Sequence, residues 1–256
     1  MTWKTVTTAA RASTLRLFLV FAIASAGAAY HASTVNADDG IGADCVRPLN
    51  LDAAFQDLAG CSFRGLTISG NTALGFSNLD GANFASATIS GVGAGIQSTA
   101  VGANFNGAEL SGDAAFAFAD LTGANLRGVL LLATDVLYGA TLRGSNLARA
   151  TIGSSTTSYV GAHADATGAN LSRATISGFV SLWDANLSGA KITNATIDGQ
   201  FALHQANLTN ADLSGTLITS NTSLRGAVYN NTTCPDGTNS DLNGGTCINH
   251  GVPDQV

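Results

Sequence analysis

The sequence predicts an all-β solenoid in which the chain winds into four-sided coils of constant length. One observation is that a large apolar residue recurs at every fifth position, with alanine two residues before it. The other is that steps of five, five, six and five add up to 21, and the pattern repeats at that interval. The pattern is clearest between residues 184 and 213, where Leu187, Ile192 and Ile197 follow Ala185, Ala190 and Ala195.

A period of five residues fits neither a straight strand nor a helix. On a strand, residues i and i+5 point to opposite faces, and on a helix they lie roughly 140° apart. If the chain bends once per five residues, every central Leu or Ile faces the same interior, and the alanine two residues earlier points inward close to the bend. The polar residues between them then face water.

The central residues form four columns, one for each side of the coil. Coils that hydrogen-bond to each other at about 4.8 Å stack such columns directly. The first column contains Leu58, Leu79, Leu121, Leu142, Leu187, Leu208 and Tyr229. The second contains Phe63, Phe84, Phe105, Leu126, Leu147, Leu171, Ile192 and Leu213. The third contains Ile68, Ile89, Leu110, Leu131, Ile152, Ile176, Ile197 and Ile218. The fourth, which is the least regular, contains Leu74, Phe116, Leu137, Leu182, Leu203 and Leu224.

The repeated segments resemble those of the pentapeptide-repeat family. The segments Ala-Asn-Leu-Ser-Gly at 185–189, Ala-Asn-Leu-Arg-Gly at 124–128 and Ala-Asp-Leu-Thr-Gly at 119–123 are similar to that family's A-(D/N)-L-X-X motif. The resemblance covers about residues 56–229 and implies a right-handed quadrilateral parallel β-helix. The sixth residue in every fourth step departs from the family pattern and predicts a bulge along one edge.

Residues 1–37 have the three parts of a signal peptide. Lys4, Arg11 and Arg16 precede or begin an apolar run at 15–29, and a small polar stretch ends at Ala37, after which we expect cleavage. An uncleaved signal anchor is the alternative, although the apolar run is short for a membrane span. We therefore expect a secreted or periplasmic protein with no membrane span after cleavage.

The charge of the chain limits its partners. Removal of residues 1–37 leaves eight basic residues against seventeen acids, a net charge of −9. An acidic chain without basic patches is not expected to bind nucleic acid. The sequence also predicts no cofactor, because it contains no phosphate-binding loop and no metal-ligand spacing.

Four cysteines lie near the two ends of the repeats. We expect two disulfides, Cys45 with Cys61 and Cys234 with Cys247, although four cysteines permit three pairings and Cys61 could instead be a buried thiol. A solenoid must cover its open ends. We assign residues 38–57 as an N-terminal cap, 58–229 as the β-helix and 230–256 as a C-terminal cap or tail.

The C-terminal segment contains Asp236, Asn239 and Asp241, whose oxygen atoms could bind calcium. Their spacing does not match a calcium-binding loop that ends in Glu, and the surrounding residues favour turns. We therefore predict turns and no metal site.

The interval of the repeat lengthens once, from 21 to 24 between Ile152 and Ile176, and predicts an insertion within residues 153–165. Loops on rigid scaffolds often carry function, so Tyr159, His163 and Asp165 are candidate site residues. The alternative is a tolerated surface insertion without a function.

The outward positions predict different surfaces on different sides. Asparagines precede the central residues of the second side and predict a ladder of amides, from Asn83 to Asn170. Threonines on the third side could bind an ordered surface, but Glu109, Leu130 and Asp198 interrupt them.

The fourth side is the candidate contact face, because apolar and aromatic residues follow its central residues. Trp183 could alternatively cover the core as a buried residue. The candidate contact residues are Phe118, Tyr138, Trp183, His204 and Arg225.

These features favour a non-enzymatic, exported structural or interaction scaffold. Its partner is an unidentified protein or a cell-envelope surface, and the chain could also form a homodimer. One alternative is a β-helix that binds or acts on polysaccharide, but its acids are scattered and no catalytic cluster is evident. The other is the DNA mimicry by which some family members bind topoisomerases, but this chain has Asn and Thr where such members have columns of carboxylates.

Overall fold

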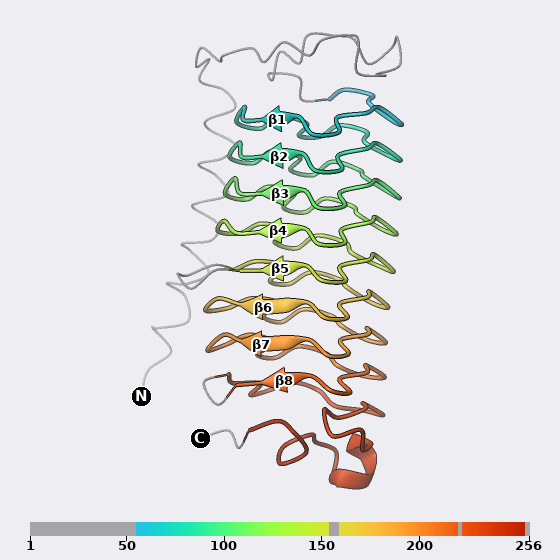
Figure 1. The fold of residues 1–256 in the computed structure, drawn as a ribbon, viewed down its shortest axis with the longest axis vertical. Helices are drawn as coiled ribbons and strands as arrows, with labels where there is room; N and C mark the ends of the chain where they lie inside the picture. The colour runs from blue at the N-terminus through green and yellow to red at the C-terminus, as the bar shows by residue number, and fades with distance from the viewer. Residues whose placement is uncertain (1–54, 154–158, 220–221, 254–256) are drawn as a thin grey trace, which may run out of the picture. The chain divides into compact units, whose positions relative to one another are not determined.

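The computed structural model describes residues 55–153, 159–219 and 222–253, which wind into stacked coils (Figure 1). The third side of each coil contains a short strand of two or three residues, and these strands form one parallel sheet in chain order from β1 to β8. The strands are β1 (Thr67–Ile68), β2 (Thr88–Ile89), β3 (Glu109–Leu110), β4 (Leu130–Leu131), β5 (Thr151–Ile152), β6 (Thr175–Ser177), β7 (Thr196–Asp198) and β8 (Leu217–Ile218).

The pairing register confirms the predicted parallel β-helix. Neighbouring strands pair residues 21 positions apart, as in Thr88 with Glu109, and only β5 and β6 are offset by 24, as in Thr151 with Thr175. Isolated parallel bridges continue the same offsets along the first and second sides. The extra three residues enter between Ile152 and Tyr159, and residues 154–158 of the predicted insertion lie outside the described residues.

The interior contains the residues that the period predicts. Central residues such as Leu187 and the alanines two positions earlier, such as Ala185, are buried in one continuous core. In the second column, the rings of Phe63, Phe84 and Phe105 stack with 4.8 Å between successive centroids. This distance equals the usual spacing of hydrogen-bonded strands, so stacked coils hold stacked side chains in contact.

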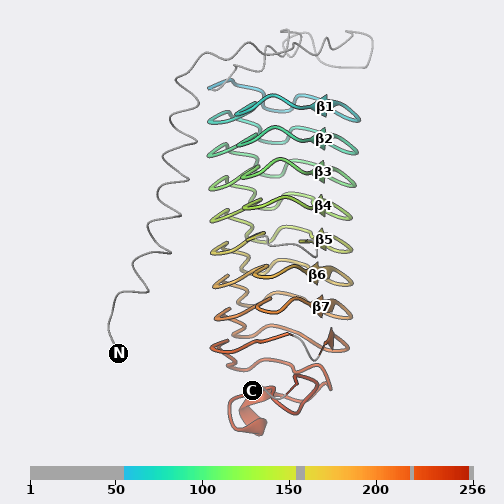
Figure 2. The same cartoon turned by 90° about the vertical axis from the view of Figure 1, so that its left-hand side faces the viewer.

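The fourth side differs from the other three in its backbone. The structure describes it as turns without β-bridges, and its central residues, such as Phe116 and Leu137, have positive φ values of 52° and 57°. Large residues seldom adopt this left-handed conformation. The fourth side is therefore a stack of turns rather than a fourth bent strand. In the second view, the strands β1 to β7 of the neighbouring third side lie along the right-hand edge of the stack (Figure 2).

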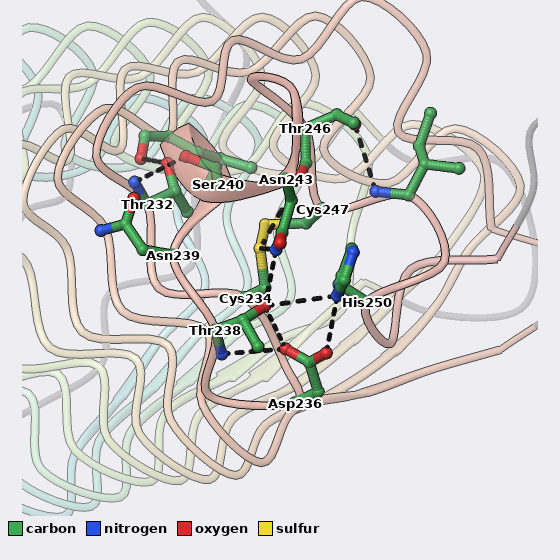
Figure 3. Close-up of a disulfide and its surroundings, with 12 residues drawn as sticks. Thr232, Cys234, Asp236, Thr238, Asn239, Ser240, Asn243, Thr246, Cys247 and His250 are labelled. Carbon is green, nitrogen blue, oxygen red and sulfur yellow. Dashed lines mark hydrogen bonds and ion pairs between the residues drawn. A yellow bond between two sulfur atoms is a disulfide. The ribbon is translucent and has the colours of Figure 1, made fainter.

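The C-terminal segment folds over the last coil. Parallel pairing continues to Thr233, which then forms an antiparallel bridge with Asn239, and the 3-10 helix η2 (Ser240–Asn243) follows. The predicted disulfide between Cys234 and Cys247 is confirmed (Figure 3).

The predicted signal peptide, residues 1–37, and all but the last three residues of the predicted N-terminal cap lie outside the described residues. Cys61 is buried and disulfide-bonded, which excludes a free thiol, but Cys45, its predicted partner, also lies outside them. The proposed domain boundaries stay predictions. In the part of the chain that the structure describes, no helix is long and apolar enough to cross a membrane.

Candidate functional site

The fourth side carries a line of aromatic rings that pass from coil to coil. The ring centroids of Phe118 and Tyr138 are 5.6 Å apart, those of Tyr138 and His163 are 5.2 Å apart, and those of His163 and Trp183 are 5.1 Å apart. Tyr159 joins the same group, with its ring centroid 6.4 Å from that of Trp183. We call these five residues the aromatic strip.

The coil geometry explains why these residues meet. Each central residue of the fourth side lies against the interior. Of the two residues that follow it, the second, and in some coils also the first, reaches the surface at the adjacent turn. Tyr138 and Trp183 directly follow the central residues Leu137 and Leu182, whereas Phe118 and His163 lie two positions after their central residues. Because the coils are stacked, rings at these two positions contact each other along the solenoid.

The aromatic strip lies at the surface. The side chains of Phe118 and Tyr159 are each 40% exposed, and Tyr138 and Trp183 are partly exposed. Trp183 is thus neither a fully buried core residue nor a freely projecting side chain. Since much of the remaining outward surface is Ser, Thr and Asn, this group of rings is the main apolar feature of the fourth side.

The rings are tilted relative to one another. The planes of Phe118 and Tyr138 meet at 71°, those of Tyr138 and His163 at 67°, and those of His163 and Trp183 at 62°. Edge-to-face contacts of this kind are favourable because the edge of one ring meets the electron-rich face of the next. They also leave the strip without a common flat surface.

Carboxylates surround the middle of the aromatic strip. Nδ1 of His163 lies 3.0 Å from Oδ2 of Asp184, and the Asp184 side chain is about half exposed. Burial raises the pKa of the Tyr138 hydroxyl, and the nearby Asp135, Tyr159 and Asp184 raise it further. The hydroxyl therefore stays neutral, and the local charge is negative.

The predicted loop residues do not form one cluster. Tyr159 and His163 join the aromatic strip, whereas Asp165 lies on the first side and binds Arg143, with 2.6 Å between its Oδ2 and the arginine Nε. Partial burial opposes ionisation of Asp165, but hydrogen bonds from Thr167 and Arg143 outweigh it and lower its pKa. Asp165 is thus a structural residue of the first side.

The last two predicted contact residues lie farther along the fourth side. His204 contacts the ring of Phe201, with centroids 5.7 Å apart, and Arg225 is exposed in the following coil. Burial lowers the pKa of His204, and the charge of Arg225 adds to this effect. His204 therefore favours its neutral form.

Sequence reasoning missed Asp184, Phe179 and Phe201. Phe179 and Phe201 form a second ring pair, with 4.9 Å between centroids, next to His204. Asp184 could have been found by reading the column two positions after the central residues, which also contains Phe118 and His163.

The second side carries the predicted ladder of asparagine amides. Nδ2 of Asn104 donates to Oδ1 of Asn83 over 3.2 Å, and Asn125 donates in the same way to Asn104 over 3.1 Å. Each asparagine oxygen also accepts from a backbone N–H two residues later, as Asn104 does from Asn106. These amides stabilise the stacking of coils and their turns.

The C-terminal cap contains a second group of polar side chains (Figure 3). Oδ2 of Asp236 lies 2.8 Å from Nδ1 of His250, and its Oδ1 accepts from the hydroxyl of Thr238 over 2.7 Å. Asn239 accepts from the N–H of Asp241 at the start of η2. Asp236 thus lies in a different turn from Asn239 and Asp241. Among the residues described, no group of three or more His, Cys, Asp or Glu could hold a metal ion.

A family model for pentapeptide repeats matches residues 96–131 with eight copies of the repeat. The same five-residue pattern and the stacked coils extend on both sides of this segment. Residues 96–131 of this chain are therefore recognised as pentapeptide repeats. No curated protein matches the chain in sequence.

Several solved structures of pentapeptide-repeat proteins are similar to this one. HetL, which is involved in the regulation of heterocyst differentiation in the cyanobacterium Nostoc, is 26% identical, with a TM-score of 0.27 over 72% of this chain and 92% of HetL. A protein of the Arabidopsis thaliana thylakoid lumen is 28% identical, with a TM-score of 0.18 over 52% of this chain and 68% of that protein. QnrB1, a plasmid-mediated fluoroquinolone resistance protein, is 17% identical, with a TM-score of 0.21 over 73% of this chain and 77% of QnrB1.

Proposed function

We propose that this pentapeptide-repeat protein is a non-enzymatic, exported scaffold that binds a partner through the aromatic strip. The observation that supports this proposal is a row of partly exposed rings, each in contact with the next, on a surface that is otherwise mostly small and polar. Aromatic residues are enriched at protein interfaces because they bury a large apolar area with few rotatable bonds.

Two features support export to a secreted or periplasmic location. Residues 1–37 have the charge and hydrophobicity pattern of a signal peptide. The cap contains the Cys234–Cys247 disulfide, and structural disulfides are typical of proteins in oxidising compartments.

The surface gives less support to the two alternative functions. A sugar ring stacks parallel to an aromatic face, but neighbouring rings of the strip are tilted by 57° or more and offer no continuous platform. A DNA mimic needs regular carboxylates, but on the first side Asp120 is followed by Thr141 and then by Asp165, which is paired with Arg143.

The proposal predicts that removal of two rings abolishes partner binding without unfolding the protein. We expect Phe118→Ser combined with Trp183→Ser to lose a partner that the wild type captures from the extracytoplasmic fraction of its own cells. Because neither ring is in the central column, we expect the thermal unfolding midpoint to fall by only a few degrees.

The control is Leu217→Ser, which removes an exposed apolar side chain from the third side. It should capture the same partner as the wild type. Equal capture by the Phe118 and Trp183 double variant would contradict the contact assignment, and recovery of the protein only from the cytoplasm would contradict export. Sedimentation of the same variants shows whether the partner is a second copy of the chain.

A further inference from the structure

The basic residues of the solenoid are separated by side, whereas its acidic residues occur on all four sides. In the part of the chain that the structure describes, lysines and arginines lie on the first and second sides or at the turns that end them, except for Arg225 near the C-terminal end of the fourth side. Those on the first and second sides are Arg64, Arg127, Arg143, Arg149, Arg173 and Lys191. The fourth side instead has Asp113, Asp135 and Asp184 in the coils that form the aromatic strip.

Two of these carboxylates, Asp135 and Asp184, lie close to the aromatic strip. Asp135 and Asp184 are close enough to Tyr138 to raise its pKa, after the larger effect of burial. Asp184 directly follows Trp183 and contacts His163. Three rings with electron-rich faces, those of Tyr138, Tyr159 and Trp183, therefore surround the ring of His163 and its partner Asp184, whose carboxylate is about half exposed.

This combination is chemically specific. A cation gains energy both from the faces of Trp and Tyr rings and from a neighbouring carboxylate, and the ring contribution grows as water is excluded. An anionic ligand would be repelled by Asp184, and a purely apolar ligand would remove water from this carboxylate, of which only Oδ2 is paired with His163. The surface thus complements a positively charged group that has apolar or aromatic atoms next to it.

We propose that Tyr138, Tyr159, Trp183 and Asp184 form a recognition site for a cationic side chain, arginine or lysine, that a protein partner presents. The inference rests on the proposed scaffold function and names the partner's chemistry. Arginine suits the site better than lysine, because its planar guanidinium stacks on an aromatic ring while its N–H groups donate to a carboxylate. The tilted rings receive one compact side chain rather than an extended flat polymer.

The test measures binding of labelled six-residue peptides to the full chain by fluorescence anisotropy at 0.15 M salt, where distant charges are largely screened. The probes are hexa-arginine, hexa-lysine, hexa-glutamate and a Gly-Ser peptide. We expect hexa-arginine to bind most tightly, and hexa-glutamate and Gly-Ser not to bind. We expect Trp183→Leu to weaken hexa-arginine binding about 5- to 30-fold, and Trp183→Phe to restore part of it.

A pair of charge variants separates the site from the overall acidity of the protein. Asp184→Asn should weaken hexa-arginine binding about as much as Trp183→Leu. Asp198→Asn, at the end of β7 on the third side, removes the same charge from an exposed residue and should leave the affinity within about twofold. Equal losses from the two Asp variants, or no loss from Trp183→Leu, would overturn the site.

Two further outcomes identify other occupants. The cation site would also be overturned if a soluble β-glucan bound in a Trp183-dependent way while hexa-arginine did not bind. It would likewise be overturned if the protein were a dimer that Trp183→Leu converts to a monomer. If the partner captured by the wild type needs the aromatic strip but hexa-arginine does not compete with it, this inference fails while the proposed function stands. If the partner does not depend on the strip, the proposed function itself fails.

Discussion

Phe84 shows how a single residue stabilises the solenoid. Its ring lies between those of Phe63 and Phe105, with interplanar angles of 11° and 9°, and it is fully buried. Its contacts come from the coils before and after it, so the same side chain links three consecutive turns of the chain. The loss of such a side chain removes apolar contacts and leaves a cavity.

We expect Phe84→Ala to lower the free energy of unfolding by about 3–5 kcal/mol, measured by chemical denaturation. Phe84→Leu should cost about 1.5 kcal/mol or less, because leucine fills the same column at Leu126 and Leu147. Equal effects of the two substitutions would show that the column does not tolerate leucine at this coil. A negligible effect of Phe84→Ala would contradict the observed stacking.

Individual inward residues could be predicted from the sequence, and all five rings of the aromatic strip were candidate residues, but their contact in one group could not be predicted. Burial follows from the five-residue period, which determined the positions of Phe84 and Leu187. His163 contacts Trp183 only because the insertion ends before Tyr159 and restores the phase of the coil. The sequence shows how long the insertion is but not where it ends, so the contacts of the residues that follow it could not be predicted.

The turns of the fourth side are the element that distinguishes this solenoid from a uniform four-stranded coil. Phe116, Leu137 and Leu203 adopt positive φ, which costs free energy for a residue with a large side chain. Burial of those side chains and backbone hydrogen bonds, such as that from the N–H of Phe116 to the carbonyl of Ala94, offset this cost. Local propensity therefore gave no indication of the left-handed turns, because packing between coils imposes them.

The corner between the third and fourth sides also depends on close backbone contact. A Cβ atom at Gly112 would overlap the carbonyl oxygen of Gly91 in the previous coil, and one at Gly91 would overlap that of Gly70. Gly123, at a turn of the first side, has open space around it and a φ of +66°. The two kinds of glycine are needed for different reasons, space in the first case and backbone conformation in the second.

We expect Gly112→Ala to lower the free energy of unfolding by about 1–3 kcal/mol, because two coil backbones must separate. Gly123→Asn should cost about 1 kcal/mol or less, since asparagine tolerates positive φ and occupies the equivalent position at Asn210. Thermal and chemical unfolding of both variants check this order. The reverse order would show that backbone conformation, rather than space, limits these corners.

At the scale of the whole molecule, stability comes from contacts between neighbouring coils, and the ends need protection. The last coil has no following coil to bind its backbone, and the C-terminal cap takes that place. Within the cap, Asp236 contacts Thr238 and His250 next to the Cys234–Cys247 disulfide. Hydrogen bonds from Thr238 lower the pKa of Asp236 to about 2, and His250 contributes a smaller part.

This pKa predicts that the cap loosens in acid. Because the folded-state pKa lies below the ordinary value of 3.8, Asp236 stabilises the cap fully above that value, and the contribution is lost as the pH falls toward 2. The measurement is the rate at which a phosphine reduces Cys234–Cys247, followed by alkylation and mass spectrometry. As the pH falls from 3.8 toward 2, we expect this rate to increase more in the wild type than in Asp236→Asn. The variant should be reduced faster than the wild type at pH 5, and equal rates there would contradict a role for Asp236.

The architecture of the whole molecule was the most predictable level. The regular repeat indicated the coils, their parallel stacking and the single longer coil, because each of these follows from which residues must face inward. The meeting of rings and carboxylates on the fourth side was only partly predictable, since it depends on the direction in which turn residues project.

Four successive coils each contribute at least one ring to the aromatic strip, and this has a consequence for how such a molecule can change. Duplication or deletion of one whole coil would lengthen or shorten the row of rings by that coil's contribution while leaving every other coil in register. The length of the surface can therefore change one coil at a time without changes to the core.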